Sequence, residues 1–323
     1  MNRDELLRLL VQEETGFVSG QEISNRLGIS RTAVWKQIEE LRKSGYEVEA
    51  VPRKGYRLLH RPNMVTSEEI KSRLETEHLG QHVIYNEEVT STQDLAHEQA
   101  QKSAPEGTIV VADRQTKGKG RLGRVWHSPP EHGLWTSLIL RPNIPPYKAP
   151  QLTLLTAVAV AEGAGNLTGA EAEIKWPNDV LLNGKKLCGI LTEMQSEADM
   201  IHAIIVGIGM NVNQQVQDFP EELKGIATSL RLEYGAPFRR ADVLKEILER
   251  FEYWYQRFLT EGFEPVRNQW EVYALSFGRR IKARTIQGTI YGIAKGITAD
   301  GVLLLEDDEG KTQQIYSADI EIQ

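Results

Sequence analysis

The hydrophobic pattern at the start of the chain predicts short amphipathic helices. Residues 4–14 place leucines at helical spacing. Ser19 and Glu22, three residues apart, form a capping-box pattern that predicts the start of a second helix. Ser30 is a suitable N-cap for a third helix over Arg31–Lys43. We therefore expect a small helical domain at the start of the chain.

A β-hairpin is predicted directly after these helices. Alternating apolar and polar residues within 46–59 flank a Pro-Arg-Lys-Gly turn, which predicts two paired strands. Two helices joined by a turn at Gly28 and followed by a hairpin form the pattern of a winged helix-turn-helix. Pro62 and Asn63 then mark a boundary, so we predict a first domain over residues 1–63.

The centre of the chain alternates strand-like and helix-like segments. The predicted strands cover residues 82–89, 107–113, 134–140, 173–175, 180–182, 188–194 and 201–208. The predicted helices cover residues 92–102, 150–163, 241–260 and 265–274. Because the strands outnumber the helices and occur in adjacent pairs, a mixed α+β sheet is favoured over a repeating βαβ fold. We assign residues 64–275 to this second domain.

The pattern changes again near residue 277. Short predicted strands, separated by Gly or Asp-Gly turns, cover residues 280–286, 288–295, 302–306 and 313–316. Strands of this length and spacing predict a small β-barrel. The third predicted domain therefore covers residues 276–323, and the whole chain is expected to be an α+β protein.

Composition narrows the class of protein. The 323 residues are 40% hydrophobic and 26% charged, which is typical of a globular chain and excludes an intrinsically disordered one. The single cysteine, Cys188, excludes an internal disulfide, and we expect it to be a core residue. His127 and His132 lack the spacing of helical metal ligands, so we predict no structural metal. Acidic residues at the N-terminus and the lack of a long apolar stretch predict a cytoplasmic protein without membrane contact.

The formal net charge of −7 argues against nucleic-acid binding, but the charge is unevenly distributed. Residues 26–61 hold nine basic and four acidic residues, a net charge of +5. The predicted third helix exposes side chains suited to phosphates and base edges, namely Ser30, Arg31, Thr32, Trp35 and Lys36. Arg53 and Lys54 fall at the tip of the hairpin, where a wing contacts backbone phosphates. We therefore predict DNA binding; the alternative is a helical cap whose charges are merely solvated.

A basic, glycine-rich segment over residues 113–124 holds five basic residues and one acidic residue. Glycines let backbone amides turn toward an anion, and Lys and Arg add positive charge. The spacing Gly118-x-Gly120-x-x-Gly123 also matches dinucleotide and kinase loops, but its proline-containing continuation cannot open a helix and no kinase motifs follow. The remaining interpretation is a loop that closes over an anionic ligand, against the alternative of a disordered basic loop.

Further polar clusters lie at the ends of predicted strands. Residues 91–94 open a helix, either as an ordinary N-cap or as a site for a small polar ligand. Residues 175–179 bring a cation, an aromatic ring, an amide and an acid into one strand–turn–strand segment. Lys186 enters the next strand, where it either faces a pocket or is solvated. Asn211 and Asn213 alternate at the end of a strand, and both are able to contact a ligand.

Together these segments resemble the bifunctional biotin–protein ligases that also repress the biotin operon, over essentially the whole chain. The matching motifs are the winged segment SGQEISNRLGISRTAVWKQIEELRKSGYEVEAVPRKGYRL, TSTQ at residues 90–93, QTKGKGRLGRVW, KWPNDV, KKLCGILTEM and GIGMNVN. The order and spacing of the five central motifs make a chance match implausible. The resemblance implies a catalytic fold of the biotin/lipoate ligase type between a winged helix-turn-helix and a small SH3-like β-barrel.

The resemblance implies the two-step reaction of a biotin–[acetyl-CoA-carboxylase] ligase. Biotin and ATP, with Mg²⁺ as the activating ion, give biotinyl-5′-adenylate and pyrophosphate. A lysine of a biotin carboxyl carrier protein then takes the biotinyl group. Because the biotin carboxylate and the acceptor lysine are the nucleophiles, such an enzyme supplies positioning and positive charge rather than a catalytic triad. No tightly bound prosthetic group is expected.

The resemblance also assigns roles to individual residues. It places Ser91, Thr92, Gln93, Gln115, Lys119, Gly120, Arg121 and Lys186 against biotin and its adenylate, with Arg121 and Lys186 as catalytic residues. It implies nucleotide or metal contacts for Arg124, Trp126, Lys175, Asn178, Asp179 and Asn211. The family loop usually reads Gly-Arg-Gly-Arg, whereas Lys119 stands at its first arginine here. Lysine keeps the charge of arginine but loses its bidentate geometry.

The repressor function implied by the resemblance needs operator DNA and a second copy of the chain. Family members bind the operator as homodimers, with biotinyl-5′-adenylate as corepressor. The adenylate favours the dimer only if it binds the dimer-competent state more tightly. Two alternatives stay open on the sequence: a lipoate-type acyl-adenylate ligase and a non-catalytic, biotin-sensing transcription factor. The winged domain and the GKGR loop argue against the first, and the retained basic loop with Lys186 argues against the second.

Overall fold

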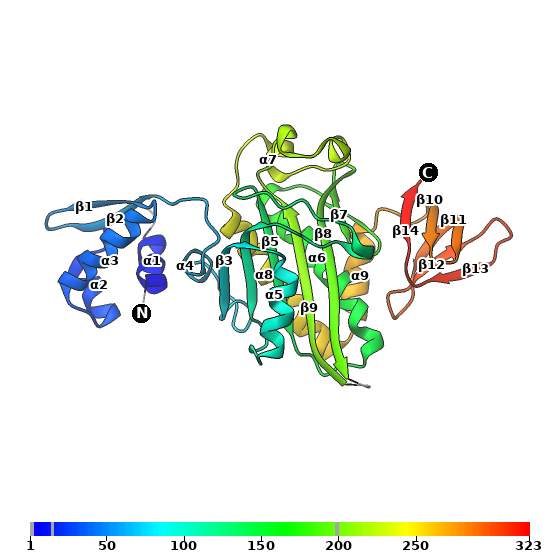
Figure 1. The fold of residues 1–323 in the computed structure, drawn as a ribbon, viewed down its shortest axis with the longest axis horizontal. Helices are drawn as coiled ribbons and strands as arrows, with labels where there is room; N and C mark the ends of the chain where they lie inside the picture. The colour runs from blue at the N-terminus through cyan, green and yellow to red at the C-terminus, as the bar shows by residue number, and fades with distance from the viewer. Residues whose placement is uncertain (1–2, 14–15, 198–199) are drawn as a thin grey trace.

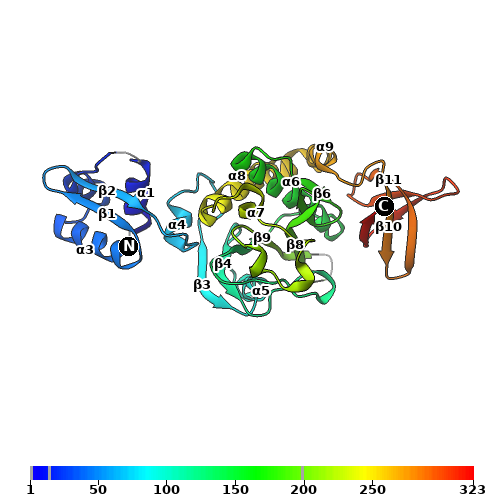
Figure 2. The same ribbon diagram turned by 90° about the horizontal axis from the view of Figure 1, so that it is seen from above.

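The computed structural model describes residues 3–13, 16–197 and 200–323. An N-terminal helical unit, a central sheet covered by helices and a C-terminal sheet follow one another along the long axis of the molecule (Figure 1, Figure 2). Within the described residues, no helix has the length and apolar character that crossing a membrane requires.

The N-terminal unit confirms the predicted helices and hairpin. Its elements are α1 (Arg3–Gln12), α2 (Gly20–Leu27), α3 (Arg31–Lys43), β1 (Glu47–Val51) and β2 (Gly55–His60). Residue 14, at the predicted end of the first helix, lies outside the described residues. Ser19 Oγ accepts a hydrogen bond from the backbone N–H of Glu22 at 3.1 Å, and Ser30 Oγ accepts one from Ala33 at 3.2 Å. Both expected N-caps are therefore present, and they fix where α2 and α3 begin.

The turn between α2 and α3 is short because small residues occupy it. Gly28 ends α2 in the left-handed conformation, with φ 64°. Ser24 Oγ donates a hydrogen bond to the carbonyl oxygen of Ile29 at 2.5 Å, which gives this backbone carbonyl group a partner within the turn. Ile23 and Val34 are fully buried between the helices, in a core separate from that of the central unit. This packing leaves the opposite face of α3 to solvent.

The central unit is built on a seven-stranded sheet with the strand order β3-β4-β5-β9-β8-β7-β6. The strands are β3 (Val83–Val89), β4 (Ile109–Gln115), β5 (Gly133–Leu140), β6 (Glu173–Lys175), β7 (Asp179–Leu182), β8 (Lys185–Glu197) and β9 (Met200–Asn211). The β3–β4 pair is parallel, and the pairs that join the remaining strands are antiparallel. The predicted mixed sheet is therefore confirmed. β8 and β9 exceed their predicted lengths because they pair with each other almost end to end.

Helices cover both faces of this sheet (Figure 2). α5 (Thr92–Gln101) lies on one face, where Ala96 and Ala100 belong to the same apolar cluster as Ile205 of β9. α6 (Ala149–Thr168) and α8 (Arg240–Glu261) cover the other face, and α9 (Glu264–Tyr273) packs against both helices. Because both faces are covered, every residue of β5 is buried. The structure adds α4 (Ser67–Lys71) and α7 (Leu230–Tyr234), which are too short to show a helical period in the sequence.

The C-terminal unit is a five-stranded antiparallel sheet with the strand order β13-β12-β11-β10-β14. Its strands are β10 (Arg280–Thr285), β11 (Gly288–Ile297), β12 (Leu303–Glu306), β13 (Thr312–Ile315) and β14 (Asp319–Ile322). The hydrophobic pattern predicts the first four of these strands, β10 to β13, but misses β14. Because β13 and β14 are the two edges, the predicted barrel is open between them. Trp176 Nε1 donates a hydrogen bond to the carbonyl oxygen of Gly301 at 3.2 Å, which joins this sheet to the central unit.

A buried arginine joins the end of the N-terminal unit to the central sheet. Arg240, the first residue of α8, is only 1% exposed. Its backbone N–H donates to Asn63 Oδ1 at 2.9 Å, and its Nη2 donates to the carbonyl oxygen of Asn63 at 2.7 Å. Its Nη1 lies 2.7 Å from Asp113 Oδ1 on β4. The strand that anchors this linker is therefore the same strand that leads into the basic segment.

Candidate active site and nucleic-acid interface

A cavity of about 700 Å³ opens above the β8–β9 pair, on the side of the sheet that carries α5. Every residue that the resemblance places against biotin, nucleotide or metal lines this cavity: Ser91, Thr92, Gln93, Gln115, Lys119, Gly120, Arg121, Arg124, Trp126, Lys175, Asn178, Asp179, Lys186 and Asn211. These residues come from separate motifs, which the fold brings together. We call this space the ligand cavity.

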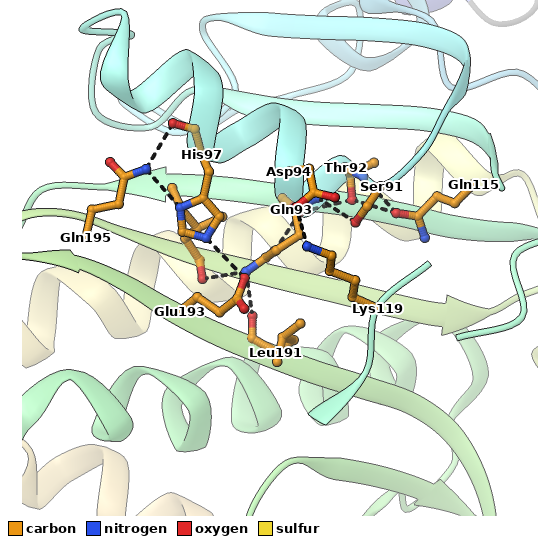
Figure 3. A network of polar contacts seen from close by, with 12 residues as sticks. Ser91, Thr92, Gln93, Asp94, His97, Gln115, Lys119, Leu191, Glu193 and Gln195 are labelled. Atoms are coloured by element: carbon orange, nitrogen blue, oxygen red, sulfur yellow. Dashed lines mark hydrogen bonds and ion pairs between the residues drawn. The ribbon is translucent and has the colours of Figure 1, made fainter. Parts of the chain in front are cut away.

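The N-terminus of α5 forms a polar wall of the ligand cavity (Figure 3). Ser91 caps the helix, and its Oγ accepts the N–H of Gln93 at 3.2 Å. Gln115, at the end of β4, accepts hydrogen bonds through Oε1 from the backbone N–H of Thr92 at 2.8 Å and from Thr92 Oγ1 at 3.1 Å. Gln115 Nε2 donates to Ser128 Oγ at 2.8 Å. The wall therefore presents hydroxyl and amide groups that are held in fixed positions.

Gln93 is anchored to the sheet on all sides of its amide group (Figure 3). Its Nε2 donates to the carbonyl oxygen of Ile205 at 3.2 Å and, more weakly, to that of Leu191 at 3.4 Å. Its Oε1 accepts a hydrogen bond from Ser137 Oγ at 3.0 Å. The side chain thus fastens the start of α5 to β8, β9 and β5. The family resemblance places Gln93 at the ligand, but no pattern in the sequence indicates that its amide is anchored to the sheet.

The basic loop, which we define as residues 116–125, is held over the ligand cavity by partners from three distant segments. Lys119 forms an ion pair with Asp94 of α5, and Arg124 forms one with Asp319 of β14. Arg121 donates through Nη1 to Asn178 Oδ1 at 2.9 Å and through Nη2 to Ser317 Oγ at 3.0 Å. These contacts give the loop a defined position and disfavour the alternative of a disordered basic segment.

Two of the loop arginines have shifted proton affinities. Burial lowers the pKa of Arg121, because a desolvated guanidinium loses hydration that favours its charged form. The hydrogen bond to the Asp319 carboxylate raises the pKa of Arg124. Both side chains remain cations at neutral pH, since an arginine is not deprotonated in proteins. The half-buried guanidinium of Arg121 is therefore a positive charge at the cavity that has lost part of its hydration.

Lys186 lies on the floor of the ligand cavity at the start of β8. Its Nζ is 2.8 Å from Asp179 Oδ1 on β7, and the same ammonium lies 5.2 Å from the centre of the Trp126 ring. Its backbone is held in turn by a loop, since its N–H donates to the carbonyl oxygen of Ile226 at 2.8 Å. Lys175 also lines the cavity and forms no ion pair within the described part of the chain. The cavity is thus lined by one lysine that is paired with a carboxylate, Lys186, and by one that forms no such pair within the described residues, Lys175.

Two glycines make the floor on which Trp126 lies. Gly189 on β8 and Gly209 on β9 are direct partners in the strand pair. A Cβ atom at Gly189 would approach the Trp126 ring to 2.9 Å, and one at Gly209 would approach Trp126 Nε1 to 2.6 Å. Any larger residue would therefore displace the indole ring. The signal in the sequence is the run of glycines inside predicted strands, and it marks a close approach of another group.

Other candidate residues have structural roles. Asn213, which the sequence offers as a residue able to contact a ligand, is not among the residues that line the cavity. Its amide instead exchanges hydrogen bonds with the backbone of Phe238, both at 2.8 Å. Cys188 is fully buried, and burial raises the pKa of its thiol. Within the described residues, no three His, Cys, Asp or Glu side chains come together as a metal site. The polar groups at the cavity are therefore mainly cations, amides and hydroxyls.

The predicted DNA-binding residues gather on one face of the N-terminal unit. A groove of about 660 Å³ runs between the start of α3 and the hairpin, and its lining includes Arg31, Thr32, Trp35, Arg53 and Lys54. Ser30 and Lys36 are exposed beside it. No acidic side chain lines this groove among the described residues. The surface therefore offers cations, a hydroxyl and an exposed indole ring to a polyanion.

Known protein families match the chain in three consecutive segments. Residues 2–57 match the HTH domain, residues 85–211 match the biotin/lipoate A/B protein ligase family, and residues 276–322 match the biotin protein ligase C terminal domain. Individual proteins match nearly the whole chain. The bifunctional ligase/repressor BirA of Bacillus spizizenii is 57% identical over 320 residues, which cover 99% of this chain and 98% of that protein.

More distant relatives extend the match. The bifunctional ligase/repressor BirA of Escherichia coli is 30% identical over 303 residues, covering 94% of this chain and 92% of that protein. The biotin protein ligase of Aquifex aeolicus, solved in complex with biotin and ATP, superposes with a TM-score of 0.65 at 34% identity, covering 75% of this chain and 99% of that one. With these matches spanning a helix-turn-helix, a ligase fold and a ligase C-terminal domain, the chain belongs to the family of bifunctional biotin–protein ligases and repressors.

Proposed function

We propose that this chain is an ATP-dependent biotin–protein ligase that also represses transcription. In the first half-reaction it joins biotin and ATP into biotinyl-5′-adenylate with release of pyrophosphate. In the second it transfers the biotinyl group to a lysine of a biotin carboxyl carrier protein. The observation that carries this proposal is the gathering of every family site residue around one cavity. ATP and DNA as partners fit a cytoplasmic location.

Adenylation requires the biotin carboxylate and the α-phosphate of ATP, both anions, to meet. Lys186, Arg121 and Lys175 supply positive charge around that point, and charge placed before the reaction costs no reorganisation during it. An incoming phosphate would compete with Asp179 for the ammonium of Lys186. Charge that builds up on the phosphate in the transition state is then stabilised by a partner already in position.

Binding of biotin is assigned to the polar wall and the glycine floor. Ser91, Thr92 and Gln115 present the hydroxyl and amide groups that a ureido ring needs. Gln93 also lines the cavity, and its hydrogen bonds to β5, β8 and β9 would hold its amide in position against biotin. The floor at Gly189 and Gly209 leaves room for flat or apolar parts of a ligand beside Trp126.

Mg²⁺ enters this proposal together with ATP. Asp179 and Asn178 offer oxygen atoms at the cavity, but one carboxylate and one amide form only part of an octahedral shell. The phosphates of ATP and water would therefore supply most of its ligands. The ion would neutralise the phosphates, while Asp179 and Asn178 would fix where it sits.

Transfer to the acceptor needs no nucleophile from the enzyme. The neutral amine of the acceptor lysine forms a bond to the acyl carbon of the adenylate and gives up a proton to solvent. The bond between that carbon and the phosphate oxygen breaks, and AMP leaves. The buried Cys188 has no path to this carbon, because its side chain is fully covered. Residues 64–275 would perform the chemistry, and residues 276–323 would complete the cavity through Asp319 and Glu321.

Repression is assigned to residues 1–63. The groove between α3 and the hairpin would take operator DNA, with α3 in the major groove and the hairpin along the phosphates. We further propose that a homodimer binds two half-sites, with biotinyl-5′-adenylate as corepressor. The adenylate would act by binding the dimer-competent state more tightly than the other state.

Biotin-dependent exchange of labelled pyrophosphate into ATP tests the first half-reaction. We expect exchange with biotin and none with lipoate, since the alternative of a lipoate-type ligase predicts the reverse. A chain that exchanges with neither would be a sensor without catalysis and would contradict the proposal. The reaction is run with the full-length protein, with and without Mg²⁺.

A further inference from the structure

A second hollow lies next to the ligand cavity, between the central unit and the C-terminal sheet. It measures about 510 Å³, and we call it the inter-domain groove. Arg121, Asn178, Ile190 and Leu191 line both the groove and the ligand cavity. The groove therefore adjoins the ligand cavity at Arg121, on the side of the C-terminal sheet.

Several contacts hold the walls of this groove in place. Trp176 Nε1 donates to the carbonyl oxygen of Gly301 at 3.2 Å, which fixes the turn after β6 to the C-terminal sheet. Thr153 Oγ1 donates to Thr192 Oγ1 at 2.8 Å, which fixes the start of α6 to β8. These residues line the groove itself. The hollow is thus bounded by anchored segments and does not depend on a free loop.

The charge in the groove differs from that in the ligand cavity. Five lysine or arginine side chains line the cavity, whereas Arg121 is the single cation among the described residues that line the groove. Its guanidinium is already engaged by Asn178 and Ser317. Asp300 supplies the one carboxylate of the groove lining, and it forms no ion pair within the described part of the chain. A positive group therefore meets less repulsion along the groove than across the basic loop.

Two exposed tyrosines line the same groove. Tyr147 is 65% exposed and Tyr316 is 76% exposed. Tyrosine rings attract an ammonium group through their faces and pack against an apolar stem. The groove thus combines an exposed carboxylate, exposed aromatic rings and a position next to the ligand cavity. Together these features match a lysine side chain presented by another protein.

We infer that the inter-domain groove is the route by which the acceptor lysine of the carrier protein reaches the adenylate, with Asp300 attracting its ammonium group at the entrance. This inference rests on the proposed ligase function. The groove delivers the amine, and Asp300, Tyr147 and Tyr316, which lie outside the ligand cavity, take no part in adenylation. It also gives the C-terminal sheet a role in acceptor recognition, since Asp300 and Tyr316 both belong to it.

The test separates the two half-reactions in the full-length protein. Asp300→Lys and Tyr316→Ala are assayed for biotin-dependent pyrophosphate exchange and for initial rates of biotin transfer over a range of carrier-protein concentrations. Transfer to hydroxylamine, a small nucleophile that needs no docking surface, serves as a third readout. Glu309→Lys and Tyr291→Ala are matched controls, because both residues are exposed on the same sheet and lie outside the groove.

We expect Asp300→Lys to raise the KM for the carrier protein at least fivefold, while exchange and transfer to hydroxylamine stay within twofold of the unmodified chain. Tyr316→Ala is expected to act in the same direction, and neither control should do so. An unchanged carrier KM, an equal loss in all three readouts, or a change in oligomeric state without a change in carrier KM would each overturn the inference. If the unmodified chain shows no exchange, the ligase proposal fails instead.

Discussion

Lys186 and Asp179 form an ion pair across adjacent strands at the floor of the ligand cavity, with Nζ and Oδ1 2.8 Å apart. Asp179 Oδ1 is buried and has no aligned hydrogen bond, so the ammonium lies within ion-pair distance but off the direction of a strong hydrogen bond. A pair of this kind holds a cation ready at the site and lets an anionic ligand take over as its partner. This relationship motivates the first prediction.

Replacing Lys186 should disable adenylation more than biotin binding. We expect Lys186→Ala to lower the rate of pyrophosphate exchange by about 100-fold or more, because removing one positioned electrostatic group from a site commonly costs about 10²–10³ in rate. Lys185→Ala is the matched control, since Lys185 is exposed on the same strand and does not line the cavity. Exchange at a near-normal rate in Lys186→Ala would remove this residue from the mechanism.

DNA binding should depend on α3 and not on the ligand cavity. We expect Arg31→Ala combined with Lys36→Ala to weaken binding to an operator fragment by at least about tenfold and to reduce its salt dependence, because each phosphate contact releases counterions. Pyrophosphate exchange should not change. Lys43→Ala is the control, because Lys43 lies at the far end of α3 and pairs with Glu40. Gel retardation unaffected by the double substitution would contradict the assignment of α3 as recognition helix.

The buried arginine at the start of α8 should matter for stability. Arg240 is 1% exposed and pairs with Asp113, so Arg240→Met leaves a carboxylate with little access to water. We expect a loss of about 3–5 kcal/mol in the free energy of unfolding, the usual cost of breaking a buried pair by removing one partner. Urea denaturation measures it.

A double substitution serves as the control for Arg240. Combining Arg240→Met with Asp113→Asn removes both charges, so its cost should be smaller than the sum of the two single costs. Strict additivity in the urea midpoints would show that the pair contributes nothing beyond its separate contacts.

The lone cysteine should be inert in the folded protein. Cys188 is fully buried, and burial raises the pKa of its thiol, so at pH 8 it stays protonated and covered. We expect a thiol-specific reagent to label it only when the protein is unfolded in guanidinium chloride. Rapid labelling of the native chain, accompanied by loss of exchange, would reveal a path to Cys188 that the structure lacks.

Local signals explain why parts of the fold are predictable from sequence. The starts of α2 and α3 follow from Ser19 and Ser30, because an N-cap acts on residues within one turn. Strand β14 (Asp319–Ile322) is missed although β13 has the same length, because no glycine turn separates the two strands in the sequence. The pairing of β8 with β9 extends both strands beyond their apolar cores, and long-range pairing of this kind leaves no local mark.

The candidate site is predictable in its members but not in its contacts. The motifs supply residues such as Lys186 and Arg121, yet nothing near Arg121 in the sequence indicates Ser317 as its partner. The anchoring role of Gln93 depends on carbonyl oxygens of β8 and β9 that only the folded sheet places there. Asn213 is a plausible ligand contact in the sequence and a structural residue in the fold, because its amide meets the backbone of Phe238.

Transfer of biotin to a purified carrier domain, detected by streptavidin blotting, tests the central claim most directly. The full-length chain is incubated with the carrier, biotin and MgATP. Parallel reactions lack ATP, replace biotin with lipoate, or use a carrier whose acceptor lysine is changed to arginine. We predict a biotinylated carrier only in the complete reaction with the intact lysine. Either an unlabelled carrier or labelling that does not require ATP would contradict the proposal that this chain ligates biotin through an adenylate.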